Sequence, residues 1–107
     1  MGNVTQEGLC LRIYLSESDN IDGKPAVETI LQLCQQCGLT GVTVLRGIEG
    51  LGAHGVHSTS FLSLSSQLPI VIEAIDSVEN MDEAVALLKP HLSGERVATW
   101  PVSLLKY

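Results

Sequence analysis

The chain has 107 residues, a formal net charge of −6 and 45% hydrophobic residues. This length suits one domain, and the hydrophobic content is sufficient for a buried core. Lys and Arg together number 6 against 12 Asp and Glu. A nucleic-acid polymer is therefore excluded as a partner, because such binders need clustered positive charge to displace counterions. A single nucleotide stays compatible, since a few basic groups and backbone N–H donors suffice for its phosphates.

The polar residues 1–8 contain no apolar core of a signal peptide, and we expect them to be disordered. No apolar run reaches the roughly 18 residues that a membrane-spanning helix needs. We therefore expect a cytoplasmic protein without membrane insertion. The 3 cysteines, an odd number, argue against a disulfide framework.

The first expected elements are a strand and a helix. Apolar and other residues alternate over 9–15, and a period of two is typical of a strand. A polar stretch rich in turn formers follows, over 16–23. Apolar residues then recur at helical spacing, which predicts a helix over 25–37 that Gly38 ends.

Two further strands are expected at 42–48 and 69–75, joined by a long loop over 53–67 that is rich in serine. A strand, a glycine-rich turn, a loop and a returning strand are typical of a scaffold that presents a loop for docking or sensing.

The last two expected elements are a helix and a strand. Asn80 and Glu83 resemble an N-cap with its capping-box partner, and Pro90 lies where this helix would end. A final strand is expected over 97–106. Pro101 predicts that this strand lies at a sheet edge or carries a bulge, because proline cannot donate to a ladder.

The resulting order, βαββαβ, predicts an α+β, ferredoxin-like fold for a single domain over 9–107. Its four-stranded antiparallel sheet would carry both helices on one face. The strands at 42–48 and 69–75 are apolar on both faces, so the helix-free face is expected to bury itself against other subunits. At about 25 cal/mol per Å², several hundred Å² would contribute on the order of 10 kcal/mol before association costs. The alternative is that β-branched residues merely favour strands.

The most distinctive stretch is the run that contains Arg46, Gly47, Glu49, Gly50 and Gly52. Glycine suits sharp bends and places where a ligand approaches the backbone. Its neighbouring N–H groups could bind an anion, with Arg46 adding a charge-assisted bond. The alternative is a bulge in which Arg46 and Glu49 pair at an interface.

The sequence also resembles a known family. The segments that carry this resemblance are Ile13-Tyr14-Leu15-Ser16-Glu17, Asp22-Gly23-Lys24-Pro25, the whole run from Gly41 to Gly52, and Leu68-Pro69-Ile70-Val71-Ile72-Glu73. They are similar to the PII-like family known as domain-of-unknown-function family 190, over about residues 9–107. That family is related to nitrogen-regulatory PII proteins. The resemblance implies a homotrimer that binds adenine nucleotides between subunits and regulates a transporter or an enzyme through a long loop.

The resemblance also suggests where the ligand binds. Gly50-Leu51-Gly52 lies where PII proteins carry a Gly-aromatic-Gly at the base of the signalling loop. Gly94-Glu95-Arg96-Val97 lies where they carry glycines and a lysine that hold phosphates, with Arg96 in place of the lysine. The loop here contains no tyrosine, so tyrosine modification of the PII type is excluded.

We therefore expect a non-enzymatic sensor. Its ligand site, with an adenine nucleotide as the implied ligand, would comprise Arg46, Gly47, Glu49, Gly50, Gly52, His54 and Arg96. Two alternatives stay open. His54 and His57 could contribute to a metal site in a trimer similar to the CutA proteins, although zinc wants three or four ligands. Either histidine could instead act as the base of a small hydrolase.

Three other residues have a structural interpretation. Cys34 and Cys37 resemble a redox pair, but they lie on the apolar face near a helix C-terminus, where the dipole opposes a thiolate. We interpret both as core residues. Glu73 falls on an otherwise apolar strand face and needs a partner, for which Arg12 or Arg46 is suitable.

Overall fold

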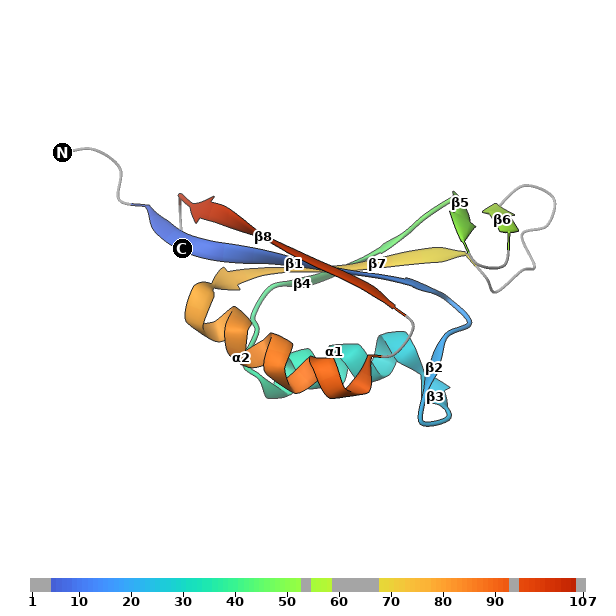
Figure 1. Ribbon diagram of the computed structural model, residues 1–107, viewed down its shortest axis with the longest axis horizontal. Coiled ribbons are helices and arrows are strands. Elements are labelled where there is room, and N and C mark those ends of the chain that lie inside the picture. The colour runs from blue at the N-terminus through green and yellow to red at the C-terminus, as the bar shows by residue number, and fades with distance from the viewer. Residues whose placement is uncertain (1–4, 53–54, 59–67, 93–94, 106–107) are drawn as a thin grey trace.

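The computed structural model describes residues 5–52, 55–58, 68–92 and 95–105, and for 49–52 and 55–58 it describes the backbone alone. A four-stranded antiparallel sheet has the order β4-β7-β1-β8. Both helices cover one face of this sheet (Figure 1). The strands are β1 (Gln6–Ser16), β4 (Val42–Arg46), β7 (Pro69–Ser77) and β8 (Arg96–Leu104). The expected α+β, ferredoxin-like fold is confirmed, and β1 begins three residues earlier than the pattern predicted.

A short hairpin that the sequence did not predict lies between β1 and the first helix. It pairs β2 (Asn20–Ile21) with β3 (Lys24–Pro25). Asp22 and Gly23 form its two-residue turn with φ angles of 52° and 78°. Positive φ at both central residues is what a tight hairpin of this kind requires, and Asp-Gly supplies it at low steric cost.

A second hairpin corrects two sequence-based boundaries. The strand expected over 42–48 ends at Arg46, and the chain turns before β5 (Glu49–Gly52). This strand pairs with β6 (Gly55–Ser58), which falls inside the expected loop. The loop expectation is therefore wrong for residues 55–58, while 53–54 and 59–67 lie outside the described residues.

Helix α1 (Ala26–Gln36) follows the expected pattern closely. Pro25 precedes it, and the amide of Ala26 donates to Asp19 O at 2.8 Å. At the other end Gly38 has a φ of 81°, and Leu39 N donates to Cys34 O at 3.1 Å. A left-handed residue that folds the next amide back onto the last turn is a common way to end a helix.

Helix α2 (Val78–Leu88) begins earlier than the sequence predicted. Its N-cap is Ser77, whose hydroxyl accepts a hydrogen bond from Asn80 N at 3.3 Å, so the assignment of Asn80 as N-cap was wrong. Asn80 instead donates from its amide nitrogen to Asp76 at 3.1 Å. A short 3₁₀ helix, η1 (Lys89–His91), continues α2. Neither α1 nor α2 is long and apolar enough to cross a membrane, and the same holds for every described helix.

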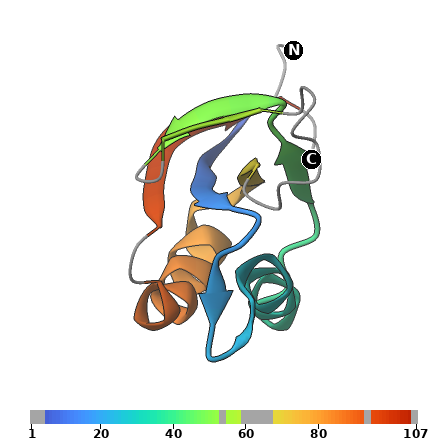
Figure 2. The ribbon, with the colours of Figure 1, turned by 90° about the vertical axis from the view of Figure 1, so that its right-hand side faces the viewer.

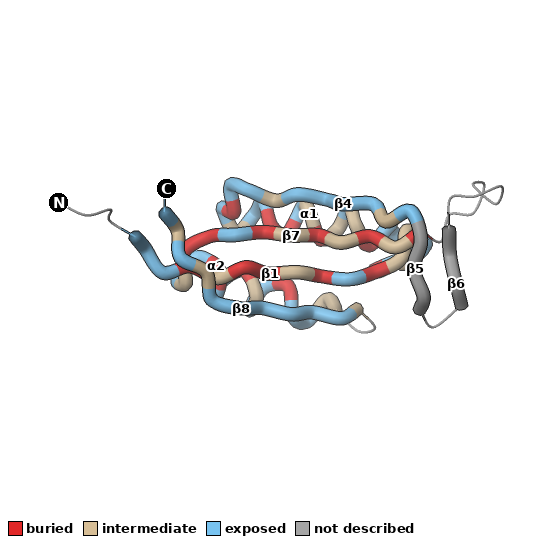
Figure 3. The backbone as a smooth tube through the Cα atoms, turned by 90° about the horizontal axis from the view of Figure 1, so that it is seen from above, coloured by how far each residue is buried: buried red, intermediate tan, exposed pale blue. Residues whose placement is uncertain are grey.

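The core lies between the sheet and the two helices. Its most buried large side chains come from both central strands and both helices: Leu11, Ile13, Ile30, Ile72, Met81 and Leu88. The period of two in β1 and β7 directs alternate side chains toward the helices. In Figure 3, β1 and β7 alternate between buried and more exposed residues, whereas the edge strands β4 and β8 are largely exposed. The edge position of β8 confirms the prediction made from Pro101.

Candidate functional site at the base of the 53–67 loop

Arg46, the last residue of β4, lies at the base of the loop. Its Nη2 forms an ion pair with Oε1 of Glu17, which follows the end of β1. The Arg46 side chain is still 61% exposed, so its other N–H donors face solvent. The second oxygen of Glu17, Oε2, is buried and accepts no hydrogen bond from the residues that the structure describes. A buried carboxylate oxygen without a donor is costly, so this position favours an additional donor.

Gly47 is required where the chain leaves β4. Its amide donates to Pro69 O at 2.7 Å, which ties the bend to the start of β7. A Cβ on this glycine would lie 2.6 Å from Pro69 Cγ, closer than side-chain atoms pack. Glu17 N likewise donates to Leu68 O at 2.9 Å. Two backbone hydrogen bonds therefore join the ends of three strands at the base of the loop.

The remaining residues of the glycine run form the β5–β6 hairpin. Glu49 is opposite Ser58, Gly50 opposite His57, and Gly52 opposite Gly55. The hairpin lies crosswise over one end of the sheet and extends from the β4 edge toward the β8 edge (Figures 2 and 3). His54 lies outside the described residues, as do the side chains of the hairpin.

Arg96 is not brought to the loop base within one chain. It is the first residue of β8, and Tyr14 of β1 pairs with it. Tyr14 also pairs with Val71, which pairs with Leu45 beside Arg46. Three strand spacings of about 4.8 Å therefore separate the β8 and β4 edges, or about 14 Å. Arg96 and Arg46 thus lie at the same end of the sheet but on opposite edges.

A polar cluster occupies the centre of the helix-free face. Arg12 Nε donates to Glu73 Oε2 at 2.7 Å, which confirms that Glu73 needs a partner on this face. The Arg12 guanidinium also lies 5.6 Å from the ring centroid of Trp100, within range of a cation–π interaction. Hydrogen bonds with Tyr14 and with Glu73 raise the pKa of Arg12, so this side chain stays charged.

Apolar side chains surround this cluster. Large ones that remain well exposed include Tyr14, Leu45, Ile75 and Trp100, and strand alternation places all four on the helix-free face. Cys10 is on this face too but is only 2% exposed. An apolar face with one internal ion pair differs from a solvated sheet face, where polar residues would alternate with the core.

Sequence reasoning did not assign a role to Glu17, although it lies beside Arg46. The signal was a charged residue directly after an apolar strand. The strand register explains why Glu17 meets Arg46, because Leu15 and Arg46 both pair with Ile70, from opposite sides of β7. Since Glu17 is two residues beyond Leu15, it reaches the same end of the sheet as Arg46.

The two cysteines of the Cys34–Cys37 motif are core residues, as expected. Cys34 is 1% exposed and belongs to the core cluster, and Cys37 packs against that cluster. Burial raises the pKa of Cys34 to about 11, with a smaller contribution from Cys37. Both thiols are free in the structure. A raised pKa disfavours the thiolate that redox chemistry requires.

Comparisons with known proteins agree on the fold. The family model DUF190, described as "Uncharacterized ACR, COG1993", matches residues 8–104. CPII from Thiomonas intermedia K12, a nitrogen regulatory PII-like protein solved with ADP, AMP and bicarbonate, is 18% identical with a TM-score of 0.71; the match covers 98% of this chain and 94% of that chain. Its apo form is 16% identical with a TM-score of 0.64, covering 96% of this chain and 97% of that chain. The GlnK–ATP complex of B. subtilis is 16% identical with a TM-score of 0.55, covering 90% and 82%.

Proposed function

Because the chain belongs to the DUF190 family, we propose that it is a PII-like regulatory protein that binds an adenine nucleotide between the subunits of a homotrimer. The nucleotide complexes of CPII and GlnK, which share its fold, support this class of ligand. The protein acts by binding rather than by catalysis, in the cytoplasm. It signals to a protein partner, a transporter or an enzyme, through the 53–67 loop.

The observation that carries the proposal is the placement of Arg46 and Arg96. Each lies at the same end of the sheet with an exposed side chain, but the two are on opposite edges. One chain therefore offers two incomplete phosphate sites. When the β4 edge of one subunit lies beside the β8 edge of the next, Arg96 completes the site that Arg46 and Gly47 begin. Two guanidinium groups suit a di- or triphosphate.

The helix-free face supports the trimer. Tyr14, Leu45, Ile75 and Trp100 expose apolar surface there, and burying it against two other copies is favourable by the hydrophobic effect. The Arg12–Glu73 pair would lie within this interface. Its geometry is already satisfied inside one chain, so association leaves no new unpaired charge.

The Arg46–Glu17 pair gives a route from ligand to loop. A phosphate at the loop base competes with Glu17 for Arg46, and Glu17 then loses its counter-ion at the point where three strand ends are joined. A ligand shifts the loop only if it binds its two states with different affinity. The remaining site residues in this proposal are Glu49, Gly50, Gly52 and His54.

Calorimetric titration with ATP, ADP, AMP and cyclic nucleotides, together with sedimentation, tests the proposal. We expect a trimer, saturable heat with at least one nucleotide, and strongly weakened binding in Arg46→Ala and Arg96→Ala. Lys24→Ala in the β2–β3 hairpin is the matched control for a lost positive charge and should bind normally.

A mixing experiment tests whether the site is shared. Arg46→Ala and Arg96→Ala proteins are unfolded together, refolded as a mixture and titrated with nucleotide. Random assembly of a cyclic trimer restores about a quarter of the sites if each site takes one arginine from each of two neighbours. A mixture that binds no better than either variant alone would contradict a shared site, and a monomer in sedimentation would refute the trimer.

A further inference from the structure

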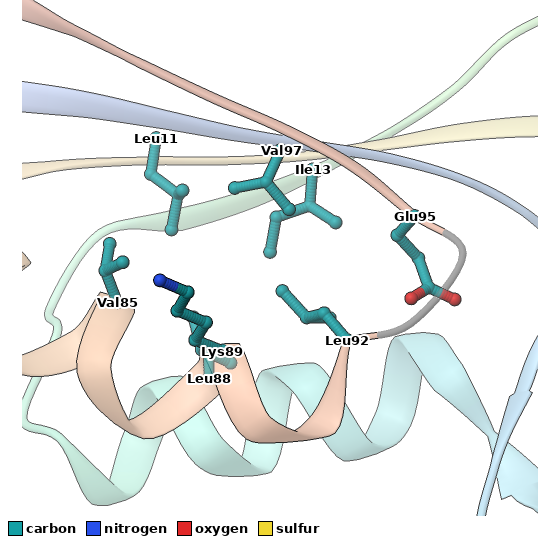
Figure 4. Close-up of a pocket in the computed structure, with 8 residues that line it drawn as sticks. All are labelled: Leu11, Ile13, Val85, Leu88, Lys89, Leu92, Glu95 and Val97. Carbon is teal, nitrogen blue, oxygen red and sulfur yellow. The ribbon is translucent and has the colours of Figure 1, made fainter.

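A pocket of about 300 Å³ opens between helix α2 and the sheet, on the β8 side (Figure 4). Its walls are apolar: Leu11, Ile13, Val85, Leu88, Leu92 and Val97. Two charged residues complete the lining, Lys89 and Glu95. The pocket lies in the layer between helices and strands, whereas Arg46 and the loop base lie at the opposite edge of the sheet.

The register of β8 explains why this space exists. On the helix side, Val97 is opposite Ile13 and Thr99 is opposite Leu11. On the other side of β1, Ile72 is opposite Ile13 and fills the core above α1 and α2. The shorter side chains of β8 do not reach as far, and Val97 remains 43% exposed although it faces the helix layer. Apolar walls in contact with water favour an apolar occupant.

Lys89 gives the pocket a chemical preference. Its side chain rises from the end of α2 toward the strands, with its ammonium group directed to the Val85 side of the pocket that Lys89 lines (Figure 4). The ion pairs found among the described residues, Arg12–Glu73 and Arg46–Glu17, do not involve it. Glu95 lines the other end of the pocket (Figure 4), and it already interacts with another group. An ammonium beside apolar walls matches a ligand with an apolar body and an anionic head.

We propose that this pocket is a second ligand site, which binds a small aliphatic carboxylate with its chain against α2 and β1 and its head group on Lys89. The size fits such a ligand, because 300 Å³ corresponds to about ten water volumes of about 30 Å³, or roughly ten non-hydrogen atoms. Octanoate has this size and chemistry. Val85 and Leu92 are only partly buried without a ligand, so an aliphatic chain would cover apolar surface that is now wet.

The pocket is connected to Arg96 through strand alternation. Glu95 and Val97 line the pocket, and Arg96 between them points to the opposite face of β8. A ligand that displaces Val97 therefore displaces Arg96 as well. This consequence rests on the proposed nucleotide site, whereas binding of octanoate does not.

The site is tested by titrating octanoate into the full chain, without nucleotide, and following backbone amide shifts by NMR. We expect saturable binding of one octanoate per chain, with shifts at Leu88, Leu92 and Val97. The fluorescence of Trp100, on the helix-free face, should stay unchanged. Shifts confined to the helix-free face, or no saturable binding, would overturn the proposal.

Two variants separate the head group from the chain. Lys89→Met keeps most of the aliphatic stem and should weaken octanoate binding roughly fivefold, the effect of one partly exposed charge pair. Neutral octanol should bind the native chain and Lys89→Met equally. Val97→Phe fills the pocket and should block both ligands while circular dichroism shows the native helix content. Equal octanoate affinity in the native chain and Lys89→Met would refute the role of the ammonium group.

The coupling is measured separately. Saturating octanoate should change the apparent affinity for ADP by threefold or more, and the change should disappear in Val97→Phe. An unchanged ADP affinity would refute the coupling. If ADP does not bind, the coupling is measured with whichever of ATP, AMP or the cyclic nucleotides binds. If none of them binds, the proposed nucleotide function fails, while the octanoate titration still decides whether the pocket is a ligand site.

Discussion

Gly47→Ala is the most direct perturbation of the loop base. The new Cβ would lie 2.6 Å from Pro69 Cγ, whereas non-bonded carbon atoms pack at about 3.5–4.0 Å. The two groups must separate by about 1 Å. Pro69 cannot simply rotate away, because its ring is closed onto the backbone and its carbonyl accepts the Gly47 amide at 2.7 Å. The substitution therefore strains or breaks the link between β4 and β7.

The expected cost follows from these contacts. Overpacking of this kind costs about 1–3 kcal/mol, and the smaller entropy of the unfolded alanine chain offsets about 0.4–1 kcal/mol of it. We expect a net loss of about 1–2 kcal/mol in the free energy of unfolding. In a domain of this size, each kcal/mol lowers the Tm by roughly 4–8 °C. Binding at the proposed site should weaken too, because Arg46 is the neighbouring residue.

Urea and thermal unfolding followed by circular dichroism measure this effect, at equal protein concentration because association changes apparent stability. Gly41→Ala is the matched control. A Cβ at Gly41 meets nothing within 4 Å, so this variant should be unchanged or slightly more stable. Pro69→Ala removes Cγ and should relieve part of the Gly47→Ala loss in the double variant. Equal stability of Gly47→Ala and Gly41→Ala would refute the steric argument.

Three further predictions concern other parts of the structure. Glu73→Leu leaves Arg12 charged on an apolar face and should lower the Tm, while adding Arg12→Met should restore most of it; an unchanged Tm in the single variant would contradict the pairing. Ser77→Ala removes the N-cap bond to Asn80 and should cost about 1 kcal/mol in urea unfolding, and a loss near zero would refute that cap. Burial raises the pKa of Cys34 from 9.0 to about 11, so the folded state holds a proton that the unfolded chain releases. The contribution of the neutral Cys34 thiol to the free energy of unfolding is therefore fully present below pH 9, and it should be lost as the pH rises to about 11. If a Cys34→Ala variant loses stability with pH at the same rate, another group is responsible.

Much of the fold could be predicted because local patterns and tertiary packing demand the same residues. The alternation in β1 indicated which side chains face the helices, and Ile13 is fully buried as that pattern required. Gly38 ends α1 with a φ of 81°, a conformation that glycine adopts without strain. Cys34 was assigned to the core from its position on the apolar helix face.

The first residue of α2 could not be predicted from the sequence pattern. Ser77 and Asn80 are both good N-cap residues, so local preference does not choose between them. The structure uses Ser77 because β7 ends there and the helix must place Met81, Ala84 and Leu88 against the sheet. Packing of these three buried residues decides the boundary.

Sequence by itself determined the layers of this protein, since side-chain periodicity is a local property that reports directly which face is buried. Only the tertiary structure decided the partners: Glu17 for Arg46, and Trp100 for Arg12. Trp100 lies on another strand and Glu17 directly follows one, and antiparallel register rather than distance along the chain brings each pair together. The pocket beside Lys89 was invisible in the sequence for the same reason, because it is formed by the mismatch in side-chain length between two neighbouring strands above one helix.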